Sequence, residues 1–357
     1  MYQTESLEKF NNLHKNYKTR DIFVLGIESS CDETSVAIIK NGDTVLSNVI
    51  SSQVEIHKRF GGVVPEVASR NHVLAIDNVL NEALAAAQIT LGDIHAIAVT
   101  YGAGLMGALM VGVNFAKSLA YALNIPLIKV NHIYSHIAAN NLQKRLYNSS
   151  YISLVVSGGH TALIKITRGK YTVIGSTYDD AIGEAYDKVA KVLGLGYPGG
   201  PQIDKLAKTG ENVIPFITKI PNYKNFNFSY SGLKTTVINY IHKQKQNGEE
   251  LNIPDICASF QTQAMNEVIT KAINACLKHK IKTLAVAGGV AANSYLREHL
   301  TATAKKYGIT VLIPPINLCT DNAAMVALEG YNSIIHKTNL AGLTLTADPN
   351  INLKFLK

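Results

Sequence analysis

The chain has 357 residues, of which 47% are hydrophobic and only 17% are charged, with Gly 26 and Pro 10. This composition excludes a disordered, collagen-like or low-complexity chain, and the length corresponds to about two domains of ordinary size. The formal net charge of +8 suits a polyanionic partner such as nucleic acid, but nearly all of the excess is lysine. An AT-rich genome produces the same bias, so charge alone identifies no nucleic-acid site.

The four cysteines lie far apart, at positions 31, 257, 276 and 319, without the paired spacing of a disulfide framework or a zinc knuckle. A reducing cytoplasm is the simplest compartment for such a chain. The first twenty residues contain no apolar stretch of a signal or anchor, so we expect a tail or an extra helix there. The most apolar stretch, 102–116, is too short and too glycine-rich to span a bilayer, and we expect no membrane association.

Hydrophobic periodicity predicts the same succession of elements in both halves of the chain. In the first half we expect strands at 22–28, 34–40 and 44–50, a helix at 65–87, a strand at 94–100, a helix up to 124 and a strand at 127–130. In the second half we expect strands at 152–156, 161–166 and 171–176, a helix at 179–193, a strand at 283–287, a helix from near 293, a strand at 310–313 and a helix at 321–335. The repetition predicts two similar α/β lobes that face each other.

Glycine-rich turns follow three of these strands, after Thr100, Val156 and Ala287. Ligands of α/β folds bind at the carboxyl ends of strands, where such turns let backbone N–H groups approach a phosphate. A single turn of this kind is also explained by steric need, but three in one chain favour a nucleotide site. A dinucleotide site of the Rossmann type is discounted because the first strand is not followed by its glycine motif.

Two histidines, His132 and His136, are four residues apart at the start of a predicted helix that follows a strand. Both rings would project from one face, which is metal-ligand spacing, although surface or capping histidines have the same spacing. Asp321 is the best third ligand, although an aspartate before a helix is also an ordinary N-cap. Two histidines and one carboxylate form a facial site that suits Fe(II), with Zn(II) or Mn(II) as alternatives. No glutamate follows His132, so the metalloprotease motif is absent.

Two further groups of polar residues remain open to more than one interpretation. Asp180, Glu184 and Asp187 form an acidic stripe on a predicted helix, which is either a solvated face or a set of carboxylates that hold ribose hydroxyls. Ser157 lies near His160 but has no identifiable orienting aspartate, so it is not convincing as a nucleophile.

Six motifs together resemble the tRNA N6-adenosine threonylcarbamoyltransferase family: GIESSCDET at 26–34, GGVVPE at 61–66, SGGHT at 157–161, YPGGP at 197–201, FSYSGLK at 228–234 and AGGVAAN at 287–293. The resemblance runs from about Val24 to about Leu345. It implies the two-lobed fold of actin, Hsp70 and sugar kinases, with a ribonuclease-H-like unit in each lobe. The expected divisions are an amino-terminal extension at 1–20, a first lobe at 21–131 completed by the carboxy-terminal helix at about 321–357, and a second lobe at 132–320.

The resemblance also implies a reaction: transfer of a threonylcarbamoyl group from threonylcarbamoyl-adenylate to N6 of the adenosine 3′ of the anticodon, in tRNAs that read codons beginning with A. Carried over by position, it implies metal ligands at His132, His136 and Asp321. It implies adenylate-binding positions at Val155, Val156, Ser157, Gly158, Gly159, Asp187, Gly200, Asp204 and Asn293. The implied partners are tRNA, a smaller paralogous subunit that forms a heterodimer, and an ATPase subunit through which ATP is used.

The departures from the family pattern are modest. Tyr134 stands where many bacterial relatives carry glutamate, Ala103 replaces a common proline, and the first twenty residues have no counterpart. The alternative functions are a non-catalytic paralogue, which the two histidines and Asp321 argue against, and an actin-like kinase or ATPase. The kinase alternative is disfavoured because Glu28, Ser29 and Ser30 occupy the place of the phosphate-binding signature of the first strand.

Overall fold

The computed structural model describes residues 2–216 and 226–351, and these form two compact units. One unit comprises the described residues up to Asn148 together with those from Thr320 onward, and the other runs from Ser149 to Cys319. The expected lobe boundary lay at 131/132, so the structure assigns 132–148 to the first unit instead. The reason is packing: the helix that begins at His132 lies against the last major helix and the central strands of the first unit.

The first unit is built on a six-stranded sheet in the order β11-β5-β4-β1-β2-β3. Its strands are β1 (Phe23–Glu28), β2 (Glu33–Lys40), β3 (Thr44–Ser52), β4 (Ala96–Gly102), β5 (Leu127–Asn131) and β11 (Leu340–Ala341). Strands β1, β4 and β5 are parallel, whereas β2, β3 and β11 pair antiparallel with their neighbours. The predicted strands of this half are therefore confirmed to within a few residues.

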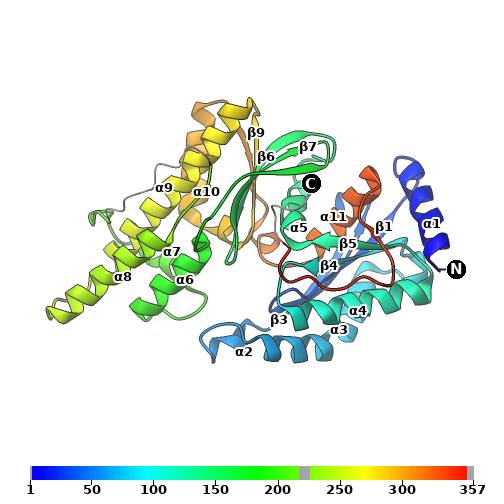
Figure 1. Ribbon diagram of the computed structural model, residues 1–357, viewed down its shortest axis with the longest axis horizontal. Coiled ribbons are helices and arrows are strands. Elements are labelled where there is room, and N and C mark those ends of the chain that lie inside the picture. Colours follow the sequence, from blue (N-terminus) through cyan, green and yellow to red (C-terminus); the bar gives the residue numbers. More distant parts are fainter. Residues whose placement is uncertain (1, 217–225, 352–357) are drawn as a thin grey trace. The chain divides into compact units, whose positions relative to one another are not determined.

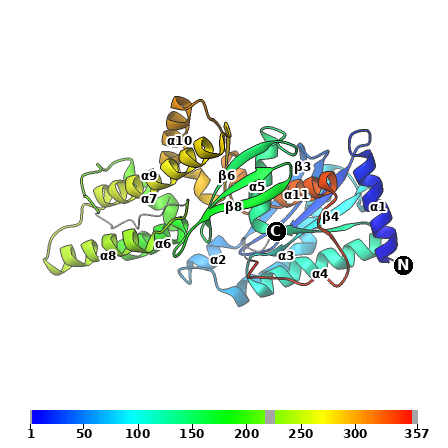
Figure 2. The same ribbon diagram turned by 45° about the horizontal axis from the view of Figure 1, so that its top comes forward.

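Helices cover both faces of this sheet because its strands are apolar on both sides. The helices are α1 (Tyr2–Asn16), α2 (Val54–Lys58), α3 (Pro65–Ala87), α4 (Met106–Leu123), α5 (His132–Ala138) and α11 (Ala323–His336). Side chains that alternate along each strand reach two separate apolar clusters, one with α1, α5 and α11 and the other with α3 and α4. Figures 1 and 2 show α3 and α4 side by side along one face of the sheet, with α11 along the other.

The amino-terminal extension forms helix α1, as the alternative of an extra helix predicted. Its residues Phe10 and Leu13 are 2% and 5% exposed and pack into the cluster around α11. The Oη of Tyr2 donates a hydrogen bond of 2.9 Å to the carbonyl oxygen of Ile125, which fixes the start of the helix. The extension is therefore part of the core of the first unit.

Among the described residues, one helix, α4, is long and apolar enough to cross a membrane by length and composition. One face of it, including Leu109, Val113 and Ala116, is buried in the cluster that it shares with α3. The other face carries partly and fully exposed side chains, so α4 has the amphipathic pattern of a helix packed on a sheet. We therefore assign it as a core helix.

The second unit repeats the strand order of the first around a five-stranded sheet, β10-β9-β6-β7-β8. Its strands are β6 (Ser150–Val156), β7 (Thr161–Thr167), β8 (Lys170–Ser176), β9 (Thr283–Ala287) and β10 (Thr310–Leu312). Strand β6 pairs antiparallel with β7 and parallel with β9, just as β1 pairs antiparallel with β2 and parallel with β4. The duplicated α/β fold predicted from the sequence is therefore confirmed.

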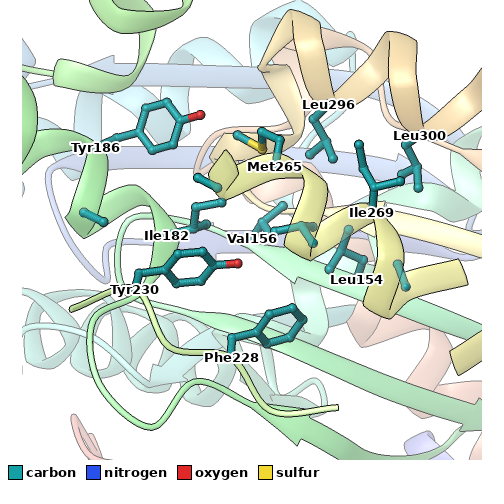
Figure 3. Packing of buried hydrophobic residues seen from close by; sticks show 14 of the residues in the cluster. Leu154, Val156, Ile182, Tyr186, Phe228, Tyr230, Met265, Ile269, Leu296 and Leu300 are labelled. Atoms are coloured by element: carbon teal, nitrogen blue, oxygen red, sulfur yellow. The ribbon is translucent and has the colours of Figure 1, made fainter. Parts of the chain in front are cut away.

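The helices of the second unit are α6 (Ile182–Leu193), α7 (Gly199–Ala207), α8 (Ser231–Gln246), α9 (Ile253–His279) and α10 (Ser294–Lys306). Helix α9 is buried along most of its length, and its Met265 and Ile269 pack against the strands, α6 and α10 (Figure 3). Tyr186 and Tyr230 are fully or almost fully buried in the same cluster, although both carry a hydroxyl. This core fixes the positions of the strands and helices whose ends carry the candidate adenylate-binding residues.

Candidate functional site

The three predicted metal ligands converge in the first unit. His132 and His136 lie on α5, and Asp321 lies two residues before α11. The Nε2 atoms of the two histidines are 3.6 and 3.1 Å from the same oxygen, Oδ1 of Asp321. One ligand atom from each residue can be chosen so that all three lie within 4.8 Å of one another. Residues separated by almost two hundred positions thus form one group.

Local structure explains why these side chains point to one place. Helix α5 begins directly after β5, and its N-cap Asn131 accepts hydrogen bonds from the N–H groups of Ile133 and Tyr134, which fixes the first turn. His132 and His136 therefore project from one face of that turn. On the other side, Asn322 caps α11 through a 3.1 Å bond from the N–H of Met325. The N-cap is thus Asn322, which leaves the carboxylate of Asp321 directed at the histidines.

A buried carboxylate holds His132, the first candidate ligand, through its other ring nitrogen. Glu28, at the end of β1, is fully buried, and its Oε2 lies 3.3 Å from Nδ1 of His132. The same oxygen accepts a 2.7 Å hydrogen bond from Oγ1 of Thr100, and Oε1 accepts a 2.6 Å bond from the N–H of Ser30. A carboxylate that holds the second ring nitrogen fixes which nitrogen of a histidine faces a metal. Sequence reasoning missed this role of Glu28, because only the fold brings β1 beside α5.

The electrostatics of the group favour positive charge between these side chains. Burial by itself lowers the pKa of His132, but the carboxylates of Asp321 and Glu28 outweigh it and raise the pKa to about 9. Burial likewise raises the pKa of Glu28, yet the nearby His132 outweighs burial, and the pKa is lowered. Burial, followed by the charges of Asp321 and Asp32, raises the pKa of Glu33 to about 9. The surrounding carboxylates thus stabilise a cation, whether a proton or a divalent metal.

The donor set fits a divalent transition metal. Two imidazole nitrogens and one carboxylate oxygen are the ligands of a facial site that keeps open positions for substrate. The side chains of His132, His136 and Asp321 are only 12%, 3% and 20% exposed, so water has limited access to them. Tyr134, the departure from the family pattern, is buried, and its hydroxyl pKa is raised by burial and then by Glu329. Tyr134 is not one of the three clustered ligand residues.

The predicted adenylate-binding residues all lie in the second unit, and the segments that follow β6 and β9 carry several of them. Val155 pairs with Ala287 in parallel register, so the turns that follow these strands are neighbours. Gly288 has φ of +93°, and a Cβ there would lie 2.4 Å from the carbonyl oxygen of Val156, so this close approach requires glycine. A Cβ at Gly158 or Gly159 would meet nothing within 4 Å. The backbone of this turn is open to a ligand.

The turn itself is held in a fixed shape. The N–H of Ser157 donates to the carbonyl oxygen of His160 over 2.8 Å, and Oγ of Ser157 accepts a 3.1 Å bond from the N–H of His160. The serine hydroxyl is thus engaged by the backbone in shaping the turn, which agrees with rejecting it as a nucleophile. Gly183, near the start of α6, packs so closely under the turn that a Cβ would lie 2.6 Å from the carbonyl oxygen of Ser157.

The remaining predicted residues form two further groups. Asp187 accepts a 2.8 Å hydrogen bond from the N–H of Gly199 and a further bond from the N–H of Gly200, although burial raises its pKa. Asp204 accepts bonds of 3.1 and 2.8 Å from the N–H and Oγ of Ser294. The structure therefore brings Asp187 together with Gly200, at the start of α7, and places Asp204 beside the start of α10.

Asn293 is the N-cap of α10, and its Oδ1 accepts a 2.9 Å bond from the N–H of Leu296. Its Nδ2 donates a 2.8 Å bond to Oε1 of Gln261, a buried side chain of α9. Sequence reasoning missed Gln261, since nothing in the pattern of α9 distinguishes it. Asn293 is therefore held rigidly from two sides.

The predicted acidic stripe, of which Asp180 lies just before α6, divides into residues of two kinds. Asp180 and Glu184 pair with Lys188 at 3.0 and 2.7 Å, and Asp180 also pairs with Lys234 at 2.6 Å. The side chain of Glu184 is 44% exposed, as the interpretation of a solvated face predicted, whereas that of Asp180 is only 14% exposed and forms a largely buried ion pair with Lys234. Asp187, in contrast, faces the backbone at the start of α7.

Comparison with known proteins agrees with this geometry. Residues 44–328 match the family model described as "tRNA N6-adenosine threonylcarbamoyltransferase". A protein of that name from Clostridium perfringens (strain SM101) is 52% identical over 332 residues, which cover 92% of this chain and 98% of that protein. A protein of the same name from Clostridium botulinum (strain 657) is 52% identical over 334 residues, covering 93% of this chain and 98% of that one.

Solved structures with low sequence identity share the fold. HypF from T. kodakarensis has a TM-score of 0.61 at 14% identity, and the match covers 89% of this chain and 48% of HypF. The activator of the 2-hydroxyisocaproyl-CoA dehydratase from Clostridium difficile has a TM-score of 0.50 at 14% identity, covering 90% of this chain and 100% of that one. These likenesses support the two-lobed α/β architecture and no more.

Proposed function

Because the chain belongs to the tRNA N6-adenosine threonylcarbamoyltransferase family, and is therefore a transferase that modifies tRNA, we propose that His132, His136 and Asp321 hold a divalent metal that serves this transfer. The observation that carries the proposal is the approach of both histidine Nε2 atoms to one oxygen of Asp321. Fe(II) is the metal that we propose, with Zn(II) or Mn(II) as alternatives, because two histidines and one carboxylate with open positions suit it.

A bound divalent metal supplies a Lewis acid that can polarise the carbonyl of an acyl donor. The protein's own residues do the positioning. Glu28 holds the Nδ1 side of His132, so that Nε2 is presented to the metal, and Thr100 and Ser30 hold Glu28 in turn. The low exposure of the ligands limits the access of water, which would otherwise hydrolyse an activated donor.

For the donor we propose threonylcarbamoyl-adenylate, held by the second unit through the residues that the family resemblance implies. The support is chemical: the turn after β6 offers its backbone at Gly158 and Gly159 without steric obstruction, as phosphate binding needs. The carboxylates of Asp187 and Asp204 can accept hydrogen bonds from ribose hydroxyls. Gly200 leaves room at the start of α7, and Asn293 offers an amide that is already fixed by Gln261.

For the acceptor we propose N6 of the adenosine 3′ of the anticodon in tRNAs that read codons beginning with A. We also propose a smaller paralogous subunit as heterodimer partner, an ATPase subunit that uses ATP to reset the cycle, and a cytoplasmic location. These partner proposals rest on membership of the family.

A reconstituted reaction tests the metal proposal. The purified chain, its partner proteins, threonylcarbamoyl-adenylate and unmodified tRNA are combined, and the digested nucleosides are examined by mass spectrometry. His136→Ala and Asp321→Ala are expected to lose both metal binding, measured by calorimetric titration with Fe(II) or Zn(II), and formation of threonylcarbamoyladenosine. His242→Ala, an exposed histidine of α8, is the matched control and should retain both. Full transfer by a variant that binds no metal would refute the metal's role.

The adenylate proposal needs a control for structural support, because Asp204 also binds the backbone at the start of α10. Asp204→Asn is expected to raise the KM for the adenylate at least about tenfold if the carboxylate binds the ribose. Ser294→Ala removes the hydroxyl partner of Asp204 while leaving the carboxylate in place. Equal effects of the two substitutions would indicate a purely structural role for Asp204.

A further inference from the structure

The second unit has a strongly basic surface at the end of its sheet opposite to the glycine turns. The parallel strands β6 and β9 end at those turns, so their first residues lie at the other edge, together with the end of β7 and the start of β8. Strand β6 has seven residues, which corresponds to roughly 20 Å between the two edges. A surface at this edge is therefore separate from the glycine turns of the same unit.

The hairpin of β7 and β8 contributes the first group of cations to this edge. Thr167 pairs with Lys170, and Arg168 lies between them in the turn. Arg168 and Lys170 are both exposed, and Lys165, two residues before Thr167, is half-buried. Three cations thus stand within six residues.

The connection from α9 to β9 brings the second group to the same edge. Lys278, Lys280 and Lys282 are exposed at alternate positions where α9 ends and β9 begins. Lys278 lies near the hairpin group, since it and Lys165 are both close to His279. Burial lowers the pKa of His279 most, and the charges of these two lysines lower it further. Lys278 also lies over the ring of Phe226, 5.1 Å from its centre. The two groups are therefore continuous.

The end of α10 contributes the third group. Lys305 and Lys306 are exposed in its last turn, and Tyr307, which follows them, is 53% exposed. Strand β10 begins three residues later, at Thr310, whose N–H donates a 2.8 Å bond to the carbonyl oxygen of Lys282. These three groups, from the β7–β8 hairpin, the α9–β9 connection and the end of α10, form what we call the basic edge (Figure 1 shows β7, α9, β9 and α10).

The basic edge has no compensating acid in the segments that form it. The sequence contains no Asp or Glu between Asp93 and Asp179, between Glu267 and Glu298, or between Glu298 and Asp321. The ion pairs of the described residues include none of the cations of the basic edge. Like charges that have no acidic partner repel one another within the fold, whereas together they attract a polyanion strongly.

A simpler explanation covers only part of this pattern. Lysines in the last turn of a helix interact favourably with its dipole, which accounts for Lys278, Lys305 and Lys306. It does not account for Arg168 and Lys170 in a β-hairpin, or for Lys282 before a strand.

We propose that the basic edge binds the phosphate backbone of the tRNA, away from the adenosine that is modified. Lysine and arginine side chains bind backbone phosphates regardless of sequence, and an exposed tyrosine among them offers a surface for stacking on a base. This docking surface rests on the proposed function for the choice of RNA as the polyanion. It would hold tRNAs of different sequence in the same way, leaving the selection of the anticodon to other contacts.

The test compares two triple charge reversals in the full chain. The edge variant combines Lys282→Glu, Lys305→Glu and Lys306→Glu. The control variant combines Lys15→Glu, Lys18→Glu and Lys243→Glu, which changes the net charge equally and, like the edge variant, removes exposed lysines at helix ends. A third variant with Gln at the three edge positions repeats the test without introducing negative charge, and thermal unfolding verifies that all of them fold.

Binding of unmodified tRNA is measured by fluorescence anisotropy over a series of salt concentrations. The edge variant is expected to bind at least about tenfold more weakly, with a slope of log affinity against log salt smaller by about two to three, since each lost phosphate contact lowers the slope by about one. The Gln variant should show the same direction with a smaller loss in affinity. The control variant should stay within about threefold of the wild type.

Equal losses in the edge and control variants would refute the proposal, because net charge alone would then explain binding. Unchanged tRNA binding by the edge variant would refute it as well. Binding to vesicles that contain phosphatidylserine is measured beside it, and a loss of vesicle binding without a loss of tRNA binding would assign the surface to an anionic lipid and refute the proposal. A transfer assay separates this proposal from the proposed function: the edge variant should raise the KM for tRNA and leave that for the adenylate unchanged. A wild-type chain that binds tRNA through the edge yet transfers nothing would refute the function and not the surface.

Discussion

Gly26 lies where strand β1 passes close to helix α11. Replacing it with alanine tests whether the packing of this helix positions Asp321, one of the candidate metal ligands. A Cβ at this position would lie 2.3 Å from the carbonyl oxygen of Ala323 and 2.7 Å from the N atom of Ala327. An ordinary contact between carbon and oxygen is about 3.3–3.6 Å, so the two elements must separate by roughly 1 Å. Both neighbours are backbone atoms of a helix, which cannot rotate away as a side chain would.

Overpacking of this kind costs about 1–3 kcal/mol, and we expect Gly26→Ala to reach the upper end of that range in urea unfolding. Asp321 precedes Ala323 by two residues, so a displacement of α11 also moves its carboxylate, now 3.1 Å from Nε2 of His136. The affinity for a divalent metal should therefore fall by about tenfold or more, measured by calorimetric titration.

Gly232→Ala is the matched control for this substitution. Gly232 lies in the first turn of α8, and a Cβ there would meet nothing within 4 Å. Alanine at this position should leave stability unchanged or raise it by up to about 1 kcal/mol, because the unfolded chain loses freedom. If Gly26→Ala unfolded within about 0.5 kcal/mol of the wild type and bound metal equally well, the proposed coupling between β1, α11 and Asp321 would be wrong.

Three other substitutions have defined outcomes. Glu28→Gln should weaken metal affinity by about 10–100-fold, because it loses the charge behind His132; calorimetry that found equal affinity would contradict this role. Asp179 accepts bonds from Ser229, Ser231 and the N–H of Tyr230, which outweigh burial and lower its pKa. The stabilisation is therefore present above the unfolded pKa of about 4 and is lost as pH falls through the lower folded pKa. The difference in urea stability between wild type and Asp179→Asn should shrink with acidification, and a difference that stays constant would argue against this role. Phe10→Ala should cost about 3–5 kcal/mol in the same assay, whereas a negligible loss would show that α1 is dispensable to the first unit.

Hydrophobic periodicity was sufficient to predict the strands and those helices for which it gave a range. The predicted helix 65–87 coincides with α3, and the predicted strand 283–287 coincides with β9. Helix boundaries were less certain where turns intervene: the helix expected at 179–193 begins only at Ile182, because Asp179 and Asp180 are engaged with Ser229, Ser231 and Lys234. Such contacts connect residues about fifty positions apart, and no local pattern indicates them.

In the candidate metal centre, too, one part of the arrangement follows from local sequence and another part depends on tertiary packing. The spacing of His132 and His136 is a local property, since one helical turn determines that both rings share a face. That Asp321 completes the group depends on α11 packing across β1, and the order of residues along the chain does not specify that contact.

The duplicated α/β order, the glycine turns and the three candidate metal ligands could all be predicted from the sequence, because each depends on local periodicity, local turn chemistry or a recognisable motif. Only the tertiary structure revealed the roles of Glu28 behind His132 and Gln261 behind Asn293, the membership of 132–148 in the first unit, and the convergence of three lysine-rich segments on one edge. Each of these features arises when segments distant in sequence are packed together, and side-chain partners across such contacts follow from the packing rather than from any local pattern.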